Sequence, residues 1–174
     1  MLPIGAPFLT RSGLRLWSKY GKNITVGKPM LNQDFREFIQ SLNDNQVRYL
    51  VVGGYAVALH GYPRYTKDID IWIELTPANA FRIIIALEQF GFGSLGLKAQ
   101  DFLEVDTIIE LGYPPRRIDL LTTLPGVDFD QAFGAKMVVD MNGLTINFID
   151  MENLIKNKRA TGRAQDVADI ENLE

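Results

Sequence analysis

The sequence predicts an α/β (α+β) domain in which helices flank a mixed β-sheet and further helices form the C-terminal end. Three observations support this prediction. Residues 49–73 contain a strand, a glycine turn, a short helix and a second strand. Residues 102–122 contain two apolar runs separated by a Gly-Tyr-Pro-Pro turn, which is typical of an antiparallel pair. Residues 150–173 show capped helical periodicity.

Length and composition bound the architecture. With 174 residues and 47% hydrophobic content, the chain is long enough for one domain with a proper core and too short for two ordinary ones. No apolar run approaches the roughly 18–20 residues of a membrane span, so we expect a cytoplasmic protein that does not enter the membrane.

The first 29 residues differ in composition from the rest. They combine several prolines and glycines with basic residues and contain no acidic residue. Pro3, Gly5 and Pro7 interrupt any apolar signal-peptide core. We therefore expect residues 1–29 to be an appended or loosely packed extension and residues 30–174 to form the domain.

The residue types limit the metals and partners. The chain has no cysteine and one histidine, which excludes disulfides, thiolate metal sites and multi-histidine zinc sites. Oxygen ligands remain, and they favour Mg²⁺ or Mn²⁺. The net charge of −3 argues against an extended nucleic-acid-binding surface, although it leaves room for a local basic patch.

A capped helix is expected at the start of the domain. Asn32 is a suitable N-cap, and the helix should end near residues 43–45. Its apolar residues recur at helical spacing and are Phe35, Phe38, Ile39 and Leu42.

The next stretch predicts a strand that leads through glycines into a short helix. Residues 50–52 are a buried apolar run that ends at Gly53-Gly54, which can adopt positive φ. Residues 55–60 then form a helix that stops at Gly61. Backbone N–H groups at such a turn and helix start can face an anion.

Two aspartates then alternate with isoleucines. Asp68 and Asp70 are expected on one face of a strand, with the isoleucines on the other. Their spacing of roughly 6.6–7 Å suits carboxylates that converge on cations. Alone, such a pair is more often the solvated face of a half-buried strand.

A second capped helix and an antiparallel strand pair follow. Thr76-Pro77 predicts a helix that ends at Gly91, and residues 102–111 and 117–122 predict the pair. Asp119 lies in apolar surroundings in the second strand, so it should be paired or bound. The expected buried residues of the helix are Phe81, Ile84, Ile85, Leu87 and Phe90.

The C-terminal third predicts further helices and a hairpin. We expect a short helix over residues 128–133, a hairpin across Asn142-Gly143, a helix from Asp150 to about Arg159, and a last helix over residues 163–173. In the last helix, Val167 and Ile170 should face inward. Asp166 and Asp169 should share one face, where they could pair with the nearby basic residues or hold a ribose, although solvated acids are the simpler interpretation.

The joint pattern resembles a known superfamily. Val-Val-Gly-Gly-Tyr-Ala-Val-Ala-Leu-His-Gly, followed by Arg64-x-Thr66-x-Asp68-x-Asp70, is similar to the nucleotidyltransferase superfamily of polymerase-β-type fold, especially its small bacterial members. Arg117-Ile-Asp119-Leu-Leu-Thr and Lys156-x-Lys158 … Arg163-x-x-Asp166-x-x-Asp169 resemble its minimal and abortive-infection toxin-like branch. The resemblance spans about residues 30–173. Many members carry a serine where this chain has Gly54.

The resemblance implies transfer of a nucleoside monophosphate from a nucleoside triphosphate to a hydroxyl acceptor, which would be a protein, an RNA end or a small molecule. Asp68, Asp70 and Asp119 would be catalytic and hold Mg²⁺ or Mn²⁺. A toxin–antitoxin pair, with an antitoxin partner, is one possible setting. The implied nucleotide-binding residues are Gly53, Gly54, Arg64, Thr66, Lys67, Lys158 and Arg163.

The alternative is a nucleotide-binding regulatory or antitoxin-like module with weak turnover. Three nearby aspartates favour the enzyme, because buried carboxylates are costly without a compensating cation. His60 is expected to pack or cap rather than catalyse. Tyr55, Tyr62 and Tyr65 could stack on a base or belong to the core.

Overall fold

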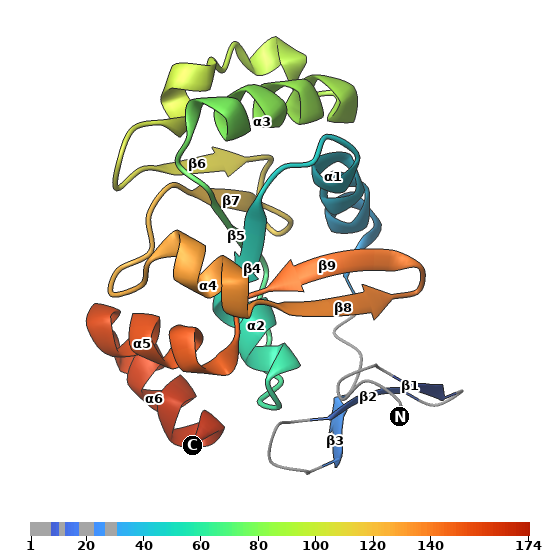
Figure 1. The fold of residues 1–174 in the computed structure, drawn as a ribbon, viewed down its shortest axis with the longest axis vertical. Coiled ribbons are helices and arrows are strands. Elements are labelled where there is room, and N and C mark those ends of the chain that lie inside the picture. The colour runs from blue at the N-terminus through green and yellow to red at the C-terminus, as the bar shows by residue number, and fades with distance from the viewer. Residues whose placement is uncertain (1–7, 11–12, 18–22, 27–30) are drawn as a thin grey trace.

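The computed structural model describes residues 8–10, 13–17, 23–26 and 31–174. Near the N-terminus, β1 (Phe8–Thr10), β2 (Gly13–Trp17) and β3 (Asn23–Val26) form a three-stranded antiparallel sheet (Figure 1). The prediction that residues 1–29 are appended or loosely packed falls largely outside the described residues and stays a prediction.

A six-stranded mixed sheet forms the centre of the domain, as predicted. The strand order is β6-β7-β5-β4-β9-β8. The pairs β5–β7 and β4–β9 are parallel, and the other three are antiparallel. The strands are β4 (Tyr49–Val52), β5 (Ile69–Ile73), β6 (Ile108–Leu111), β7 (Ile118–Leu121), β8 (Met137–Met141) and β9 (Leu144–Phe148).

The predicted helices are present, and most begin at the predicted cap. Side chains of Asn32, Thr76, Asp128 and Asp150 accept hydrogen bonds from backbone N–H groups three residues later. Figure 1 shows α5 and α6 together beside α2. The α-helices are α1 (Gln33–Asp44), α2 (Gly53–Leu59), α3 (Pro77–Phe90), α4 (Phe129–Ala135), α5 (Met151–Thr161) and α6 (Ala164–Leu173).

The core follows the apolar pattern of the sequence in most elements. The isoleucines of β5 at positions 69, 71 and 73 are fully buried, and every residue of β4 is buried. The four apolar residues expected to line the inner face of α1 are buried as well. The Asn142-Gly143 turn joins β8 and β9 with positive φ at both residues, as tight hairpin turns require.

The inner face of α3 was predicted only in part: Leu87 is buried and Ile84 and Phe90 pack partly buried against the core, but Phe81 does not. Phe81 is 62% exposed, and the helix buries Ile83 and Ala86 instead. The reason is Asn79, a fully buried polar residue whose amide bonds the backbone of Arg48 and Glu74. These bonds fix the rotation of α3, because an unpaired buried amide is costly.

The predicted strand over residues 102–111 is also only partly correct. Phe102 ends the short 3₁₀-helix η2 (Ala99–Phe102), which follows η1 (Gly93–Leu95), and pairing begins only at Ile108. Asp106 has φ of +53°, which an extended strand does not allow. The antiparallel pairing of β6 with β7 is confirmed.

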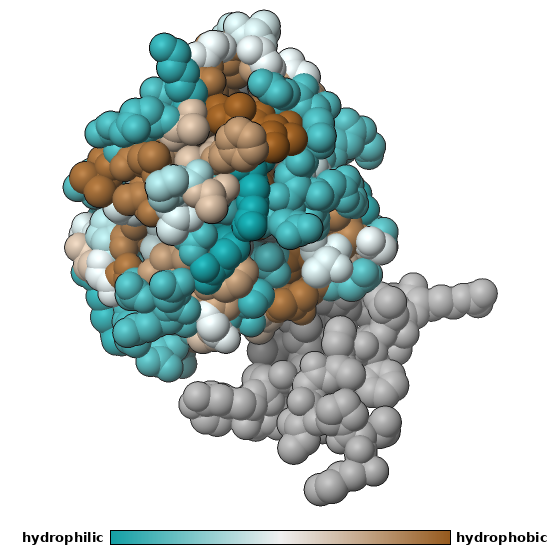
Figure 2. Space-filling model, turned by 45° about the horizontal axis from the view of Figure 1, so that its top comes forward, coloured by the Kyte–Doolittle hydropathy of each residue, from teal (hydrophilic) through white to brown (hydrophobic). Residues whose placement is uncertain are grey.

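No helix in the described part of the chain is both long and apolar enough to cross a membrane. Several large apolar side chains are nevertheless exposed, among them Phe81, Val105 and Ile108. Figure 2 shows hydrophobic patches interspersed with hydrophilic surface on one face.

Candidate active site

The two aspartates that the sequence singles out on neighbouring strands lie directly opposite each other. Asp70 in β5 is the register partner of Asp119 in β7, and the two strands are parallel. Asp68 precedes Asp70 by two residues, so both point to the same face of the sheet. The topology therefore brings Asp68, Asp70 and Asp119 together at one place, which no local pattern specifies.

The carboxyl group of Asp70 lacks a countercharge in direct contact. Burial and the negative charges of Asp119 and Asp68 raise its pKa to about 6. Arg163 and Arg64 act in the opposite direction without reversing the shift. None of the described residues forms an ion pair or a hydrogen bond with this carboxylate. Asp70 is therefore the least compensated of the three aspartates, since Arg117 contacts the other two.

Gly53 lies against this carboxylate. It has φ of +61°, and a Cβ atom built there would be 2.2 Å from Asp70 Oδ2. Any other residue would therefore meet both backbone strain and a steric clash. The glycine gives the Asp70 side chain its place beside the start of α2.

Gly54 is required by a different contact. A Cβ at this position would lie 2.8 Å from Thr66 Cβ and 2.9 Å from Thr66 Oγ1. The Thr66 hydroxyl donates to the backbone oxygen of Asp68 at 3.1 Å. Thr66 thus fills the space beside Gly54 and braces the approach to the aspartate strand.

Asp119 is paired, as its apolar surroundings predict. Its two carboxylate oxygens accept from Arg117 Nε at 2.7 Å and from Nη2 at 2.9 Å. The same guanidinium lies 3.5 Å from Asp68 Oδ2 and 3.0 Å from Glu110 Oε1. Sequence reasoning missed the participation of Arg117 and Glu110. The i, i+2 spacing of Arg117 and Asp119 was an available signal, because such residues share a strand face.

A buried ion-pair network connects α5 to α6. Lys158 is 3% exposed, and its Nζ lies 3.0 Å from Asp166 Oδ1 and 2.7 Å from Asp169 Oδ2. The simpler interpretation, that Asp166 and Asp169 are solvated, is therefore wrong, since they are 2% and 0% exposed, and the alternative of pairing with basic residues is confirmed. The inward placement of Val167 is also wrong, since it is 48% exposed. The buried lysine draws the acidic face of α6 inward, because a buried ammonium needs carboxylate partners.

The same two carboxylates hold two arginines. Asp169 accepts from Arg64 Nε at 3.0 Å and from Arg64 Nη2 at 3.2 Å, and Asp166 Oδ2 accepts from Arg163 Nε at 2.8 Å. Burial alone would raise the pKa of Asp166, but hydrogen bonds from Arg163 and other donors hold it well below its usual range. The positive charges of both arginines act on Asp70. The C-terminal helices thus fix two cationic groups near the aspartates.

The remaining predicted residues differ in their surroundings. Lys67 is exposed, whereas the Lys158 ammonium is already occupied by two carboxylates. Phosphate binding by either lysine stays a prediction. His60 packs as expected, with Nε2 2.8 Å from the Ile149 backbone oxygen. Tyr55 is buried against Phe35.

Tyr65 is 79% exposed, and Tyr62 is partly buried. The negative charges of Tyr65 and Asp68 add to burial in raising the pKa of Tyr55. The loop before β5 therefore presents an exposed aromatic ring that interacts electrostatically with Tyr55, while Tyr55 itself belongs to the core.

The donor chemistry of the site fits Mg²⁺ or Mn²⁺. Asp68, Asp70 and Asp119 offer only carboxylate oxygens, and Asp70 is crowded by like charges. However, no three acidic or histidine side chains between residues 31 and 174 are arranged as a ready-made metal site. Arg117 instead takes hydrogen-bonding positions on Asp119 and contacts Asp68.

Comparisons with known proteins agree with this architecture. The family described as nucleotidyltransferase of unknown function (DUF6036) matches residues 30–174. The structure is similar to the crystal structure of a "putative nucleotidyltransferase" from Thermotoga maritima, with a TM-score of 0.52 and 18% identity over 79% of this chain and 88% of that chain. It is also similar to an antigenic nucleotidyltransferase-like protein from Paracoccidioides brasiliensis, with a TM-score of 0.49 and 16% identity over 82% and 77% of the two chains.

No curated protein matches the chain. The similarity to the Thermotoga structure is one of fold, and it supports the mixed sheet with flanking helices as a nucleotidyltransferase fold. The family match covers every residue of the six-stranded sheet and all six α-helices. The chain therefore belongs to this nucleotidyltransferase family.

Proposed function

We propose that the protein transfers a nucleoside monophosphate from a nucleoside triphosphate to a hydroxyl acceptor, and releases pyrophosphate. The observation that carries this proposal is the placement of Asp70. Its carboxylate lies opposite Asp119, two residues after Asp68 and against a glycine that leaves it room. Burial, together with the negative charges of Asp119 and Asp68, raises the pKa of Asp70 to about 6, and a bound cation would offset both effects.

Asp68, Asp70 and Asp119 would hold Mg²⁺ or Mn²⁺ at this place. When bound, the metal would neutralise phosphate charge and lower the pKa of the acceptor hydroxyl. Asp119 would take up the acceptor proton. Gly53 and Gly54 would offer backbone N–H groups at the start of α2 to the phosphates.

Arg64 and Arg163 would supply positive charge to the triphosphate. Each is held by a buried carboxylate, which limits the freedom of its side chain. Fixed guanidinium groups suit phosphate recognition, because little conformational freedom is lost on binding. Lys158 would act indirectly, by holding Asp166 and Asp169 in place.

The acceptor would be a protein, an RNA end or a small molecule in the cytoplasm. A toxin–antitoxin setting remains part of the proposal through the resemblance of the Arg117-Ile-Asp119 and Arg163-x-x-Asp166 segments to the toxin-like branch. The exposed ring of Tyr65, in the loop that leads to Asp68, offers a surface on which a base of the nucleotide or the acceptor would stack.

One observation favours the alternative of a regulatory nucleotide-binding module with weak turnover. Arg117 already neutralises Asp68 and Asp119, and a site closed to metal in this way would bind nucleotide without transferring it. This alternative predicts that nucleotide binding is independent of Mg²⁺.

Thermal shift with nucleotide and Mg²⁺, alone and together, tests the proposal. We expect the two ligands together to stabilise the wild type more than the sum of their separate effects, because a metal at the aspartates neutralises the triphosphate. The Asp68→Ala, Asp70→Ala double variant should lose this excess. Equal shifts in the wild type and the double variant would place nucleotide binding elsewhere.

A further inference from the structure

Arg117 is surrounded by carboxylates from three adjacent segments of the sheet. Its Nε and Nη2 atoms form a fork on Asp119, its Nη2 lies 3.5 Å from Asp68 Oδ2, and its Nη1 lies 3.0 Å from Glu110 Oε1. Its backbone N–H also donates to Asp68 Oδ1 at 3.3 Å. The guanidinium is therefore bound by oxygen atoms on several sides, as a metal ion in the same place would be.

The register explains this arrangement. Glu110, Asp119 and Asp70 are partners across β6, β7 and β5, so their side chains form one row on one face. Arg117 and Asp68 lie side by side, because the Ile69 N–H donates to the Arg117 backbone oxygen. One cation thus serves two of the three carboxylates that would hold a metal, and Asp70 remains outside its reach.

Asp119 cannot serve both cations fully at once. Both of its oxygens accept from Arg117 in a bidentate fork, and a guanidinium retains its charge throughout the physiological pH range. A divalent ion brought within coordination distance of the same oxygens would face this positive charge at close range. The guanidinium must therefore move before Asp119 can ligate a metal.

The Arg117 side chain has room to rotate toward solvent. Its exposed fraction is 27%, and Glu110, the outermost carboxylate of the row, is 56% exposed. The Nη1 atom already contacts Glu110, so a rotation of the guanidinium toward solvent can keep that ion pair while it releases Asp119 and Asp68.

On the basis of the proposed function, we infer that Arg117 is an internal counter-cation that competes with the divalent ion for Asp119 and Asp68. Without metal it holds the carboxylates together and offsets their repulsion. Metal binding displaces it toward Glu110. The apparent metal affinity is therefore reduced by the fraction of molecules in which Arg117 remains paired with Asp119.

Mn²⁺ titration of the full-length protein without nucleotide tests this inference, with free Mn²⁺ followed by electron paramagnetic resonance. If Arg117 is paired in about 90–99% of molecules, Arg117→Gln should bind Mn²⁺ about tenfold to a hundredfold more tightly than the wild type. Arg117→Lys keeps the positive charge but loses the bidentate fork, so its Mn²⁺ affinity should lie between those of the wild type and Arg117→Gln. It also serves as the test if the glutamine variant does not fold.

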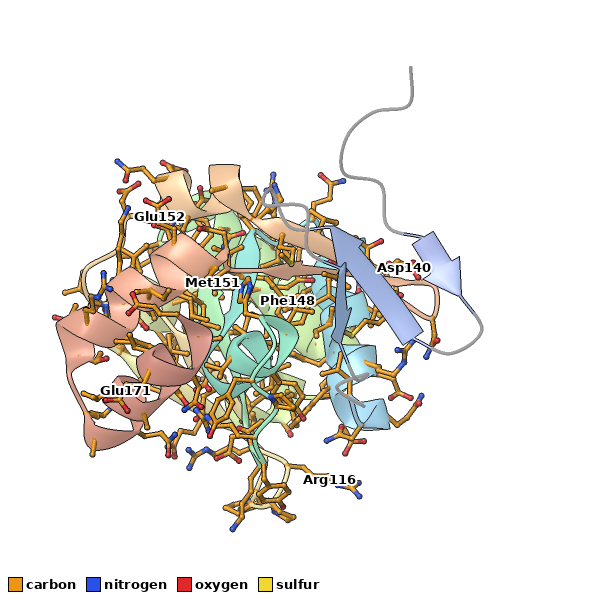
Figure 3. The ribbon with its side chains drawn as sticks, turned by 90° about the horizontal axis from the view of Figure 1, so that it is seen from below. Arg116, Asp140, Phe148, Met151, Glu152 and Glu171 are labelled. Atoms are coloured by element: carbon orange, nitrogen blue, oxygen red, sulfur yellow. The ribbon has the colours of Figure 1, made fainter. Side chains whose placement is uncertain are left out.

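Arg116→Gln is the matched control. Arg116 is the neighbouring arginine, its side chain is 64% exposed, and its contact with Asp34 is at 3.7 Å. Figure 3 shows its side chain projecting from the loop away from the body of the domain. This variant removes the same charge one residue away and should bind Mn²⁺ as the wild type does.

Three results would overturn the inference. Equal or weaker Mn²⁺ binding by both Arg117 variants, with binding still abolished by Asp70→Asn, would overturn the competition and leave the proposed function intact. If Arg116→Gln bound Mn²⁺ as much more tightly than the wild type as Arg117→Gln does, the change in affinity would come from net charge alone. If Mn²⁺ binds neither the wild type nor Arg117→Gln, the inference and the metal dependence of the proposed function fail together.

Discussion

The Asp70 carboxylate occupies the space that a side chain on Gly53 would need, since a Cβ atom at Gly53 would lie 2.2 Å from Asp70 Oδ2. The strand that carries the acid and the turn that begins α2 are therefore fitted to each other. In this site the glycine is required by a neighbouring acid as well as by its own backbone angle.

Gly53→Ala should destabilise the fold by about 3 kcal/mol, because backbone strain of about 1–2 kcal/mol adds to the cost of overpacking. Gly96→Ala is the control. Gly96 has φ of +70°, but no atom lies within 4 Å of a Cβ built there, so it should show the strain alone. Urea denaturation of both variants measures the difference. Equal losses of stability would show that the contact with Asp70 relaxes at no cost.

The raised pKa of Asp70 predicts a pH-dependent stability. Because the folded chain holds this proton more tightly than the unfolded chain, the free energy of unfolding should fall as pH rises from about 4 to about 6. Asp70→Asn has no carboxyl group to ionise at this position, so its free energy of unfolding should not fall in this way. In the presence of a chelator it should be about 1–2 kcal/mol more stable than the wild type at about pH 7, after allowance for solvent screening.

The difference between Asp70→Asn and the wild type should disappear below about pH 3, where the wild-type carboxyl is mostly protonated in both states. Added Mg²⁺ at about pH 7 should stabilise the wild type more than the variant, since the ion offsets the repulsion. A stability difference that does not vary with pH would mean that Asp70 already has an adequate countercharge.

The buried network predicts a large cost for losing Lys158. Lys158→Met should destabilise the protein by about 3–5 kcal/mol, because Asp166 and Asp169 would remain buried with less positive charge. Lys156→Met is the matched control. Lys156 is two residues away on the same helix, is half exposed and pairs only with Glu152 among the ion pairs of the described residues, so its loss should cost less than about 0.5 kcal/mol.

Thermal and urea denaturation compare the two lysine variants. Lys158→Met should also weaken nucleotide binding, because Arg64 and Arg163 lose the rigid carboxylates that hold them. If Lys158→Met were as stable as Lys156→Met, the network would be dispensable and Arg64 would need another explanation for its position.

Local patterns predicted those elements that are determined within a few residues. The Asn32 cap of α1, the alternation of β5 and the Asn142-Gly143 turn each depend on near neighbours in sequence. The rotation of α3 could not be predicted in the same way, because Asn79 finds its partners at residues 48 and 74. Distant partners overrode the apolar periodicity.

The candidate site shows the same division. Asp68, Asp70 and Asp119 were identified from residue type and spacing, whereas their proximity depends on the parallel pairing of β5 with β7. Glu110 became part of the site only through its register with Asp119. The burial of Asp169 depends on Lys158 and Arg64, which are 11 and 105 residues away in the chain. Burial of that kind is not visible in the periodicity of a single helix.

Nucleotidyl transfer itself is tested most directly by the fate of the α-phosphate. The protein is incubated with Mg²⁺, cell extract and each nucleoside triphosphate, labelled in parallel at the α- or the γ-phosphate. We predict that an acceptor gains the α-label and not the γ-label, and that Asp70→Asn reduces this transfer at least about a hundredfold. An acceptor that gains the γ-label, or α-label transfer that is unchanged in Asp70→Asn, would contradict the proposed reaction.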